Sequence, residues 1–116
     1  MAYDEQLAGR VRAVLAGVEG VSERKMFGGL SFLQHGNLVC GVMGERLLVR
    51  LGEEQTAAAV AEPHVRYMDL QRRPSVNTVY VEPAGCEGDA ELRAWVERAL
   101  DYVGTLPAKR VRARRR

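Results

Sequence analysis

Alternating apolar and polar positions dominate the segment from residue 25 to residue 51. Apolar Leu38, Cys40 and Val42 occupy every second position, as expected for a strand with one buried face. The alternation stops and restarts at short turns that contain glycine, a residue that readily adopts the positive φ required by tight hairpins. We therefore predict three consecutive strands here, joined as an antiparallel meander on which the rest of the chain packs.

A shorter strand is predicted immediately before the meander. It starts near Val21 and ends with Lys25, Met26 and Phe27. The pair of glycines that follows, at positions 28 and 29, is typical of a bend or a β-bulge. The first part of the sheet therefore has three strands, or four if this segment pairs with the meander.

Three segments carry the features of helices. Residues 3–16 place apolar side chains at three- and four-residue steps, with acidic residues at the N-terminal end, where the helix dipole favours negative charge. Residues 52–62 open with acidic residues and are rich in alanine, but their apolar face is thin. Residues 89–103 carry a broad apolar stripe, with Asp89 as the expected N-cap and Trp95 as an expected core side chain.

The region between the second and third helices is poorly periodic. Val65 and Tyr67 suggest a brief strand, residues 71–75 are expected to form a loop, and residues 78–81 are β-branched or aromatic, as in a strand. The predicted order is therefore α, three or four strands, α, two strands, α. An antiparallel sheet covered by helices mainly on one face, in a two-layer α+β domain, satisfies this order.

The composition is that of an ordinary globular domain. The chain has 116 residues, of which 47% are hydrophobic and 28% charged, and this suffices for one core without disulfides or metals. It contains no run of about 18 apolar residues, so no membrane-spanning helix is expected. The N-terminal region lacks an apolar signal core, and only two cysteines occur. These features predict a cytoplasmic protein with no membrane partner.

Positive charge is concentrated at the C-terminal end. The formal net charge is +2, but six of the 17 basic side chains lie in the last eight residues. The chain before these eight residues has 11 basic and 15 acidic side chains, a net charge of −4. We expect residues 1–107 to form the domain and residues 108–116 to be a disordered basic tail. The basic side chains of the tail are Lys109, Arg110, Arg112, Arg114, Arg115 and Arg116. They are suited to bind nucleic-acid phosphates without sequence preference, and equally to solubilise the chain or dock on a partner.

No group of residues in the sequence assembles a catalytic or metal site. His35 falls in a predicted turn and His64 follows Pro63, and neither has a carboxylate, cysteine or second histidine at a suitable spacing. Cys40 lies on the buried face of its predicted strand, where it serves as a small hydrophobe. Cys86 falls in a predicted exposed turn next to an acidic residue, which raises a thiol pKa. We therefore expect no enzymatic activity, no cofactor and no metal.

Arginines are the main charged feature of the predicted sheet. Arg46 and Arg50 share one face of a strand, and further arginines follow downstream, namely Arg66, Arg72 and Arg73. Together they are suited to a patch that binds an acidic partner. The alternative is a solvated face on which they pair with nearby acids, namely Glu45, Glu53, Glu54 and Asp69. Lys25 is expected at the surface or at an interface.

One run of residues, KMFGGL at positions 25–30, gives the sequence a family resemblance. It is accompanied by Met1 to Asp4 and Phe32, and further along by Gly36-Asn37, Cys40-Gly41-Val42, Arg46-Leu47, Met68, Arg73-Pro74 and Tyr80-Val81. In this setting residues 1–107 resemble the N-terminal domain of the TfoX/Sxy family of bacterial competence regulators. The resemblance implies a compact α+β fold like that of secretion chaperones, a homodimer and a protein partner in transcription regulation. It implies no catalytic residues.

The leading hypothesis is a non-enzymatic, cytoplasmic regulatory module that acts through protein–protein contacts. Its candidate interaction residues are Lys25, Met26, Phe27, Arg46 and Arg50, near an edge of the small sheet. The family's full-length regulators continue into a second, helical domain where this sequence carries the basic tail, so the resemblance alone does not imply a role in competence. Accessory nucleic-acid binding through the tail is the alternative. An enzyme or small-ligand binder would require a deep pocket with convergent polar groups.

Overall fold

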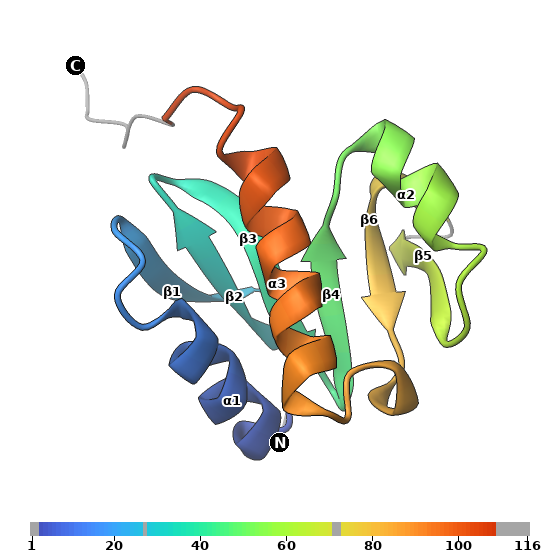
Figure 1. Cartoon of the computed structure of the whole chain (residues 1–116), viewed down its shortest axis with the longest axis horizontal. Coiled ribbons are helices and arrows are strands. Elements are labelled where there is room, and N and C mark those ends of the chain that lie inside the picture. The colour runs from blue at the N-terminus through green and yellow to red at the C-terminus, as the bar shows by residue number, and fades with distance from the viewer. Residues whose placement is uncertain (1–2, 27, 71–72, 109–116) are drawn as a thin grey trace.

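The computed structural model describes residues 3–26, 28–70 and 73–108 of the chain (Figure 1). The helices are α1 (Glu5–Leu15), α2 (Glu53–Ala59) and α3 (Asp89–Val103). The strands are β1 (Val21–Met26), β2 (Gly29–Gln34), β3 (Asn37–Met43), β4 (Arg46–Arg50), β5 (Val65–Leu70) and β6 (Arg73–Val81). A single 3₁₀ turn, η1 (Pro83–Gly85), connects β6 to α3 within the described part of the chain. None of the helices among the described residues is long and apolar enough to cross a membrane.

The strands form one six-stranded sheet in the order β1–β2–β3–β4–β6–β5, and every neighbouring pair is antiparallel. β2, β3 and β4 make the predicted meander, and β1 pairs with β2 as the predicted fourth strand. The second pair of strands follows α2, and β6 joins β4 so that β5 becomes the outer strand. The structure thus confirms the α+β class and the predicted order of elements.

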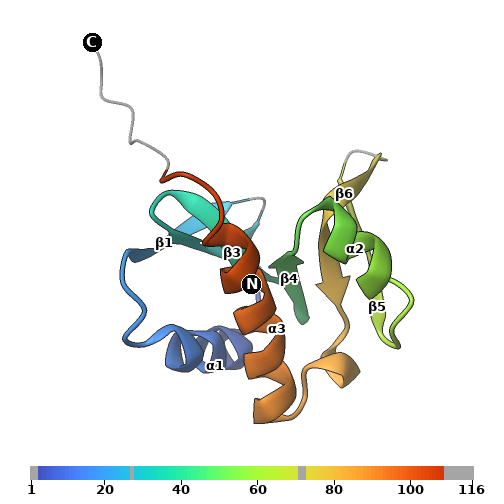
Figure 2. The same ribbon diagram turned by 45° about the horizontal axis from the view of Figure 1, so that its top comes forward.

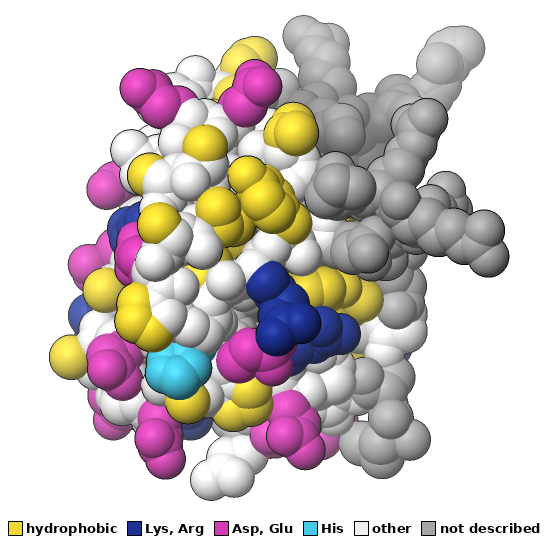
Figure 3. All heavy atoms as spheres, turned by 90° about the vertical axis from the view of Figure 1, so that its right-hand side faces the viewer, with side chains coloured by type: hydrophobic (Ala, Val, Ile, Leu, Met, Phe, Trp, Pro, Cys, Tyr) yellow, Lys and Arg dark blue, Asp and Glu magenta, His cyan; other side chains and the backbone are white. Residues whose placement is uncertain are grey.

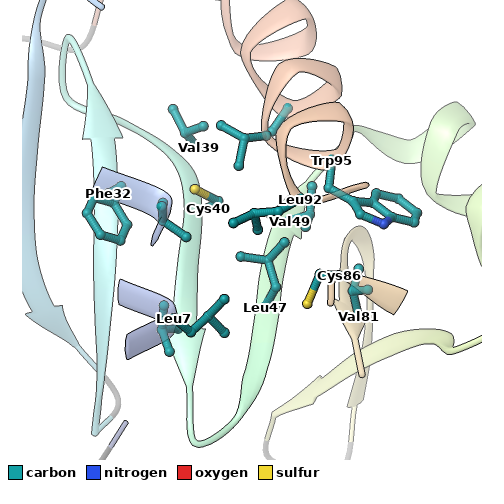
Figure 4. Packing of buried hydrophobic residues seen from close by; sticks show 14 of the residues in the cluster. Leu7, Phe32, Val39, Cys40, Leu47, Val49, Val81, Cys86, Leu92 and Trp95 are labelled. Atoms are coloured by element: carbon teal, nitrogen blue, oxygen red, sulfur yellow. The ribbon is translucent and has the colours of Figure 1, made fainter. Parts of the chain in front are cut away.

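All three helices lie on one side of the sheet (Figures 1 and 2). α3 packs along β3 and β4, α1 packs against α3, and α2 packs on β6. The core between the helices and the sheet collects buried side chains from every one of these elements, among them Leu7, Phe32, Leu47, Val49 and Leu92 (Figure 4). The prediction of helices covering mainly one face of an antiparallel sheet is therefore confirmed.

Trp95 is a core residue, as the sequence predicts. Its indole is 6% exposed, and its Nε1–H donates to the carbonyl oxygen of Gly85 at 3.2 Å. Arg98, one turn further along α3, lies over the ring at 4.3 Å from its centroid and also pairs with Glu62 after α2. Trp95 therefore links α3 to η1, and Arg98 links α3 to the end of α2.

The start of α1 and the N-cap of α3 differ from the predicted ones. α1 begins after Asp4, whose carboxylate caps the helix by accepting from the backbone N–H groups of Gln6 (2.9 Å) and Leu7 (3.2 Å). At α3 the N-cap is Gly88 rather than Asp89, and the Glu91 carboxylate accepts from the Gly88 N–H at 3.0 Å. A carboxylate at the third helical position can satisfy the cap from inside the helix, so Asp89 is not needed for this role.

The predicted loop over residues 71–75 is wrong in its second half, because β6 already starts at Arg73. Here β6 extends past the end of β4 and pairs with β5 alone, for example between Asp69 and Pro74. Proline has no N–H to donate to a second neighbouring strand, and this part of β6 has no second neighbour in the described sheet. Pro74 is therefore tolerated at this position. The predicted bend at Gly28–Gly29 lies at the β1–β2 hairpin, where Gly28 precedes β2 and Gly29 pairs with Met26. The irregularity in the β2–β3 ladder lies elsewhere, between Phe32 and Leu33.

Replacing Leu47 by alanine should lower the free energy of unfolding by about 2–5 kcal/mol, because it leaves a cavity at the centre of the sheet. Leu47 is completely buried between β4 and the helices. Gln55→Ala is the control, since Gln55 is exposed on α2 and its truncation should change stability by about 0.5 kcal/mol or less. Urea unfolding followed by circular dichroism measures both. Equal effects of the two substitutions would contradict this assignment of the core.

Candidate interaction surface

The side of the sheet turned away from the helices carries its own apolar cluster. Leu48, Met68 and Tyr80 are buried there, and Leu38 and Met43 pack against them while remaining half-buried. Side chains alternate along a strand, so Leu48 points away from the helices while its neighbours on β4 point toward them. We call this surface, with the arginines described below, the helix-free face.

Gly41 makes room for the helix-free cluster at the middle of β3. A Cβ atom at this position would lie 2.8 Å from the carbonyl oxygen of Leu30 and 3.6 Å from Cδ2 of Leu48. The first of these distances is too short for any side chain, and the Leu30 backbone is held in the β2–β3 ladder. Glycine is therefore required here by the close approach of the neighbouring strand.

Arg46 lies over the Tyr80 ring, with its Cζ 4.0 Å from the ring centroid. The pairing of β4 with β6 places Leu48 opposite Tyr80, and Arg46 lies two residues before Leu48 on the same face. A guanidinium over a tyrosine face is attracted by the ring quadrupole and leaves its own N–H edges available. The stack covers Tyr80, which is only 5% exposed.

Arg50 lies at the other end of β4. Its Nη1 donates to the carbonyl oxygen of Leu38 at 3.4 Å, and its Cζ lies 5.7 Å from the centroid of the Tyr102 ring. Tyr102 belongs to the last turn of α3, so this arginine bridges the end of the sheet and the end of the helix. Both sequence-predicted arginines are therefore held in place by neighbours and remain partly accessible.

Arg66 extends the arginine row to the outer strand β5. It lies opposite Tyr80 in the β5–β6 ladder, and its Nε is 3.1 Å from Oε2 of Glu82. Figure 3 views the molecule from the edge where β5 lies and shows a basic patch that adjoins acidic and hydrophobic side chains. Arg66 is thus the member of the row that already has a carboxylate partner.

Among the described residues, Arg46 and Arg50 do not form the predicted pairs with nearby acids. Within 4.0 Å, no ion pair there joins Arg46 or Arg50 to any carboxylate, including those of Glu45, Glu53 and Glu54. Position 72 and the side chains at positions 69 and 73 lie outside the described residues. The two arginines of β4 therefore stack on aromatic rings and bond to backbone instead of forming salt bridges within the described chain.

β1 contributes to both faces of the sheet. Val21 packs in the main core and Glu23 pairs with Arg12 of α1, so Lys25 shares their side, toward the helices. Met26 falls on the opposite side, with Arg46 and Arg50, and is half-buried. The structure thus separates Lys25 from Met26, Arg46 and Arg50.

Some candidate residues cannot be placed, and one member of the face was missed. Phe27 and residues 109–116 lie outside the described residues, so contact through Phe27 and nucleic-acid binding through the tail stay predictions. Arg24 is exposed on the helix-free side of β1, opposite Ser31. The alternation of Glu23 and Arg24 along the strand could have revealed it.

Both cysteines are buried. Burial raises the pKa of the Cys40 thiol to about 12. Cys86 was predicted in an exposed turn, but it is 2% exposed and lies in the core beside Val81 (Figure 4). Its pKa is raised mainly by burial; Arg10 opposes the shift, and Glu91 and Glu82 add to it. The correction follows from η1, which folds the chain back under α3 so that the thiol points inward.

The two histidines occupy exposed positions in turns, as predicted. Both have positive φ, +50° at His35 and +66° at His64. Among the described residues, no group of three or more His, Cys, Asp or Glu side chains is arranged to hold a metal ion.

A hollow of about 570 Å³ lies between the start of α1 and η1. Its lining includes Arg10, Glu45, Pro83 and Glu87. Arg10 is already engaged, since its Nη2 donates to the Glu87 carbonyl oxygen at 2.8 Å and approaches the Asp89 carboxylate at 3.3 Å. This guanidinium therefore stabilises the junction of α1 with the start of α3.

Comparison with known proteins gives one match. A scan against models of protein families matches the TfoX N-terminal domain over residues 13–103. The matched region runs from the second half of α1 to the end of α3 and so includes the whole sheet. A search of curated proteins and a search of solved structures found no match.

Thiol labelling should distinguish the folded from the unfolded chain. In the native protein Cys40 should not react with a disulfide reagent even when the pH rises above the ordinary thiol pKa of 9.0, because its pKa is about 12 and it is buried. Cys86 should react slowly, and both thiols should react at once in concentrated guanidinium chloride. Rapid native labelling of Cys40, located by mass spectrometry, would contradict the described core.

Proposed function

Because the chain belongs to the TfoX N-terminal domain family, we propose that it is a non-enzymatic regulatory module that works through protein–protein contacts. The observation that carries this proposal is the helix-free face, where Leu38 and Met43 remain half-buried between Arg46 and Arg50. One uncovered face of an antiparallel sheet is normally polar. Here it combines apolar side chains with arginine and tyrosine, the residue types that are enriched in protein interfaces.

The chemistry of the remaining residues supports binding over catalysis. Both thiols have a raised pKa, so near neutral pH they are protonated and weak as nucleophiles. The Arg10 guanidinium, which lines the hollow between α1 and η1, is engaged with its own chain. As part of the proposal we place the protein in the cytoplasm, where two unbridged cysteines are stable in the reduced state.

Capture of partners from the native cell should depend on the two arginines of β4. We define the face variant as Arg46→Glu with Arg50→Glu, and the control variant as Lys25→Glu with Arg93→Glu. Both variants change the charge equally, but Lys25 and Arg93 are exposed on the helix side. The face variant should capture at least tenfold less of a partner that the wild type and the control variant retain. Equal capture by both variants would show that the contact lies elsewhere.

We also propose that the chain forms a homodimer through the β5 edge of the sheet. Among the described residues, the large hydrophobic side chains with high exposure are Tyr67 on β5 (40%) and Val76 on β6 (54%). β1, the opposite edge, carries three consecutive charged residues, which discourage edge pairing. Two β5 strands related by a two-fold axis can extend the ladder antiparallel across the interface.

Sedimentation equilibrium over a range of concentrations tests the dimer. Tyr67→Glu with Val76→Glu should raise the dimer dissociation constant at least tenfold, because two charges would be buried at the contact. Ala13→Glu, on the exposed side of α1, should leave it unchanged. A wild-type chain that stays monomeric up to the highest usable concentration would refute the dimer.

A further inference from the structure

We infer that the helix-free face binds an acidic segment of a partner protein, whose carboxylates contact Arg46 and Arg50 and whose apolar side chain lies against Leu38 and Met43. This inference rests on the proposed function and specifies the chemistry of the partner. Three observations carry it, namely the charge of the face, the way its arginines are held, and the burial of its aromatic ring.

The face is basic although the domain is acidic. Its strands place four arginines on the helix-free side, namely Arg24, Arg46, Arg50 and Arg66. Among the described residues, the carboxylate that pairs with one of these four arginines is that of Glu82, which contacts Arg66. The chain before the tail has a net charge of −4, so its excess acidic side chains lie mainly on other surfaces. An isolated basic surface on an acidic body attracts and orients an acidic segment.

The arginines of β4 are held in place before any partner binds. Arg46 is fixed by the Tyr80 ring, and Arg50 by the Leu38 carbonyl and the Tyr102 ring. A side chain that is already ordered loses less entropy on binding. A stacked guanidinium still presents N–H groups in its plane, which can hold a carboxylate with two parallel hydrogen bonds.

The spacing of the arginines sets the spacing of the carboxylates that they would bind. Arg46 and Arg50 are four residues apart on one strand, which places their Cα atoms about 13 Å apart at the usual rise of a strand. Their guanidinium groups reach away from each other, toward Tyr80 of β6 and Tyr102 of α3. Leu48 lies between them, with Leu38 and Met43 beside it. The matching ligand therefore carries acidic side chains at both ends of a short apolar stretch, and not a uniform row of charges.

Nucleic acid fits this face less well. Non-specific binding of single strands relies on aromatic rings on which bases stack. Tyr80 is 5% exposed, and Arg46 covers its ring. A second copy of the chain docked face to face would bring like charges together, which is unfavourable. A protein segment with separated carboxylates meets neither obstacle.

Selection from a displayed library of random 12-residue peptides tests the inference on the full chain. Peptides enriched on the wild type should contain pairs of Asp or Glu that flank a large apolar residue. A synthetic peptide of the enriched sequence, followed by fluorescence anisotropy, should bind the face variant at least tenfold more weakly than the wild type and the control variant. Its affinity should also fall as salt is raised.

Matched variants keep the result interpretable. Arg46→Lys with Arg50→Lys preserves the charge but not the planar guanidinium, so it should fold and still bind several-fold more weakly than the wild type. Thermal unfolding of each variant verifies its fold. Enriched peptides without acidic residues, or enrichment no greater than on the face variant, would overturn the inference.

Two further outcomes separate this inference from the proposed function. If a natural partner depends on Arg46 and Arg50 but contacts them through a segment without acidic residues, the proposed function stands and the inference fails. If a single-stranded DNA oligonucleotide binds the wild type and loses affinity on the face variant while no peptide is enriched, the face binds nucleic acid. In that case both the inference and the protein-contact role of the face are wrong.

Discussion

The central strands β3 and β4 must be covered on both sides, and this requirement shapes the whole domain. Leu47, Leu48 and Val49 are consecutive and all buried, although side chains alternate along a strand. On one side α3 covers them with a continuous stripe of apolar residues. On the other side no helix among the described elements is available, and long side chains from neighbouring strands cover Leu48 instead. Arginine can serve in this way because its aliphatic stem and flat head pack on apolar surface while the charge stays in contact with water.

Elements with strong local patterns could be predicted from the sequence. The last helix begins and ends at the predicted residues, 89 and 103, because its apolar stripe is broad and Gly104 follows it. The meander could be predicted because its apolar alternation is interrupted by glycine-containing turns. The start of β6 could not, because Arg73 and Pro74 are placed in the strand by pairing with β5, and such pairing leaves little trace in local composition. The cap of α3 was assigned to the wrong residue because two acidic side chains compete for the same role.

The interaction surface was predictable only in part. The two-residue period places Arg46 and Arg50 on one face of β4, and the structure confirms this. Their stacking partners, Tyr80 and Tyr102, lie 34 and 52 residues further along the chain and depend on the register of β4 with β6 and on the docking of α3. Lys25 lies on the helix side of the sheet, because it shares the two-residue period of Val21 and Glu23 along β1. Burial of Cys86 likewise depends on the return of the chain at η1, which local spacing does not reveal.

The two ends of the described chain are tied to opposite ends of β3. The Asp4 N–H donates to the Gly44 carbonyl at 2.8 Å, next to the strand pair that carries Arg46. Asn37 donates from Nδ2 to the Pro107 carbonyl at 3.0 Å, next to Leu38, which Arg50 contacts. A molecule fused before Asp4 is therefore attached close to Arg46, and a molecule fused after Pro107 is attached close to Arg50. Because effective concentration depends on linker length, a short linker at either terminus would favour one half of the arginine pair over the other.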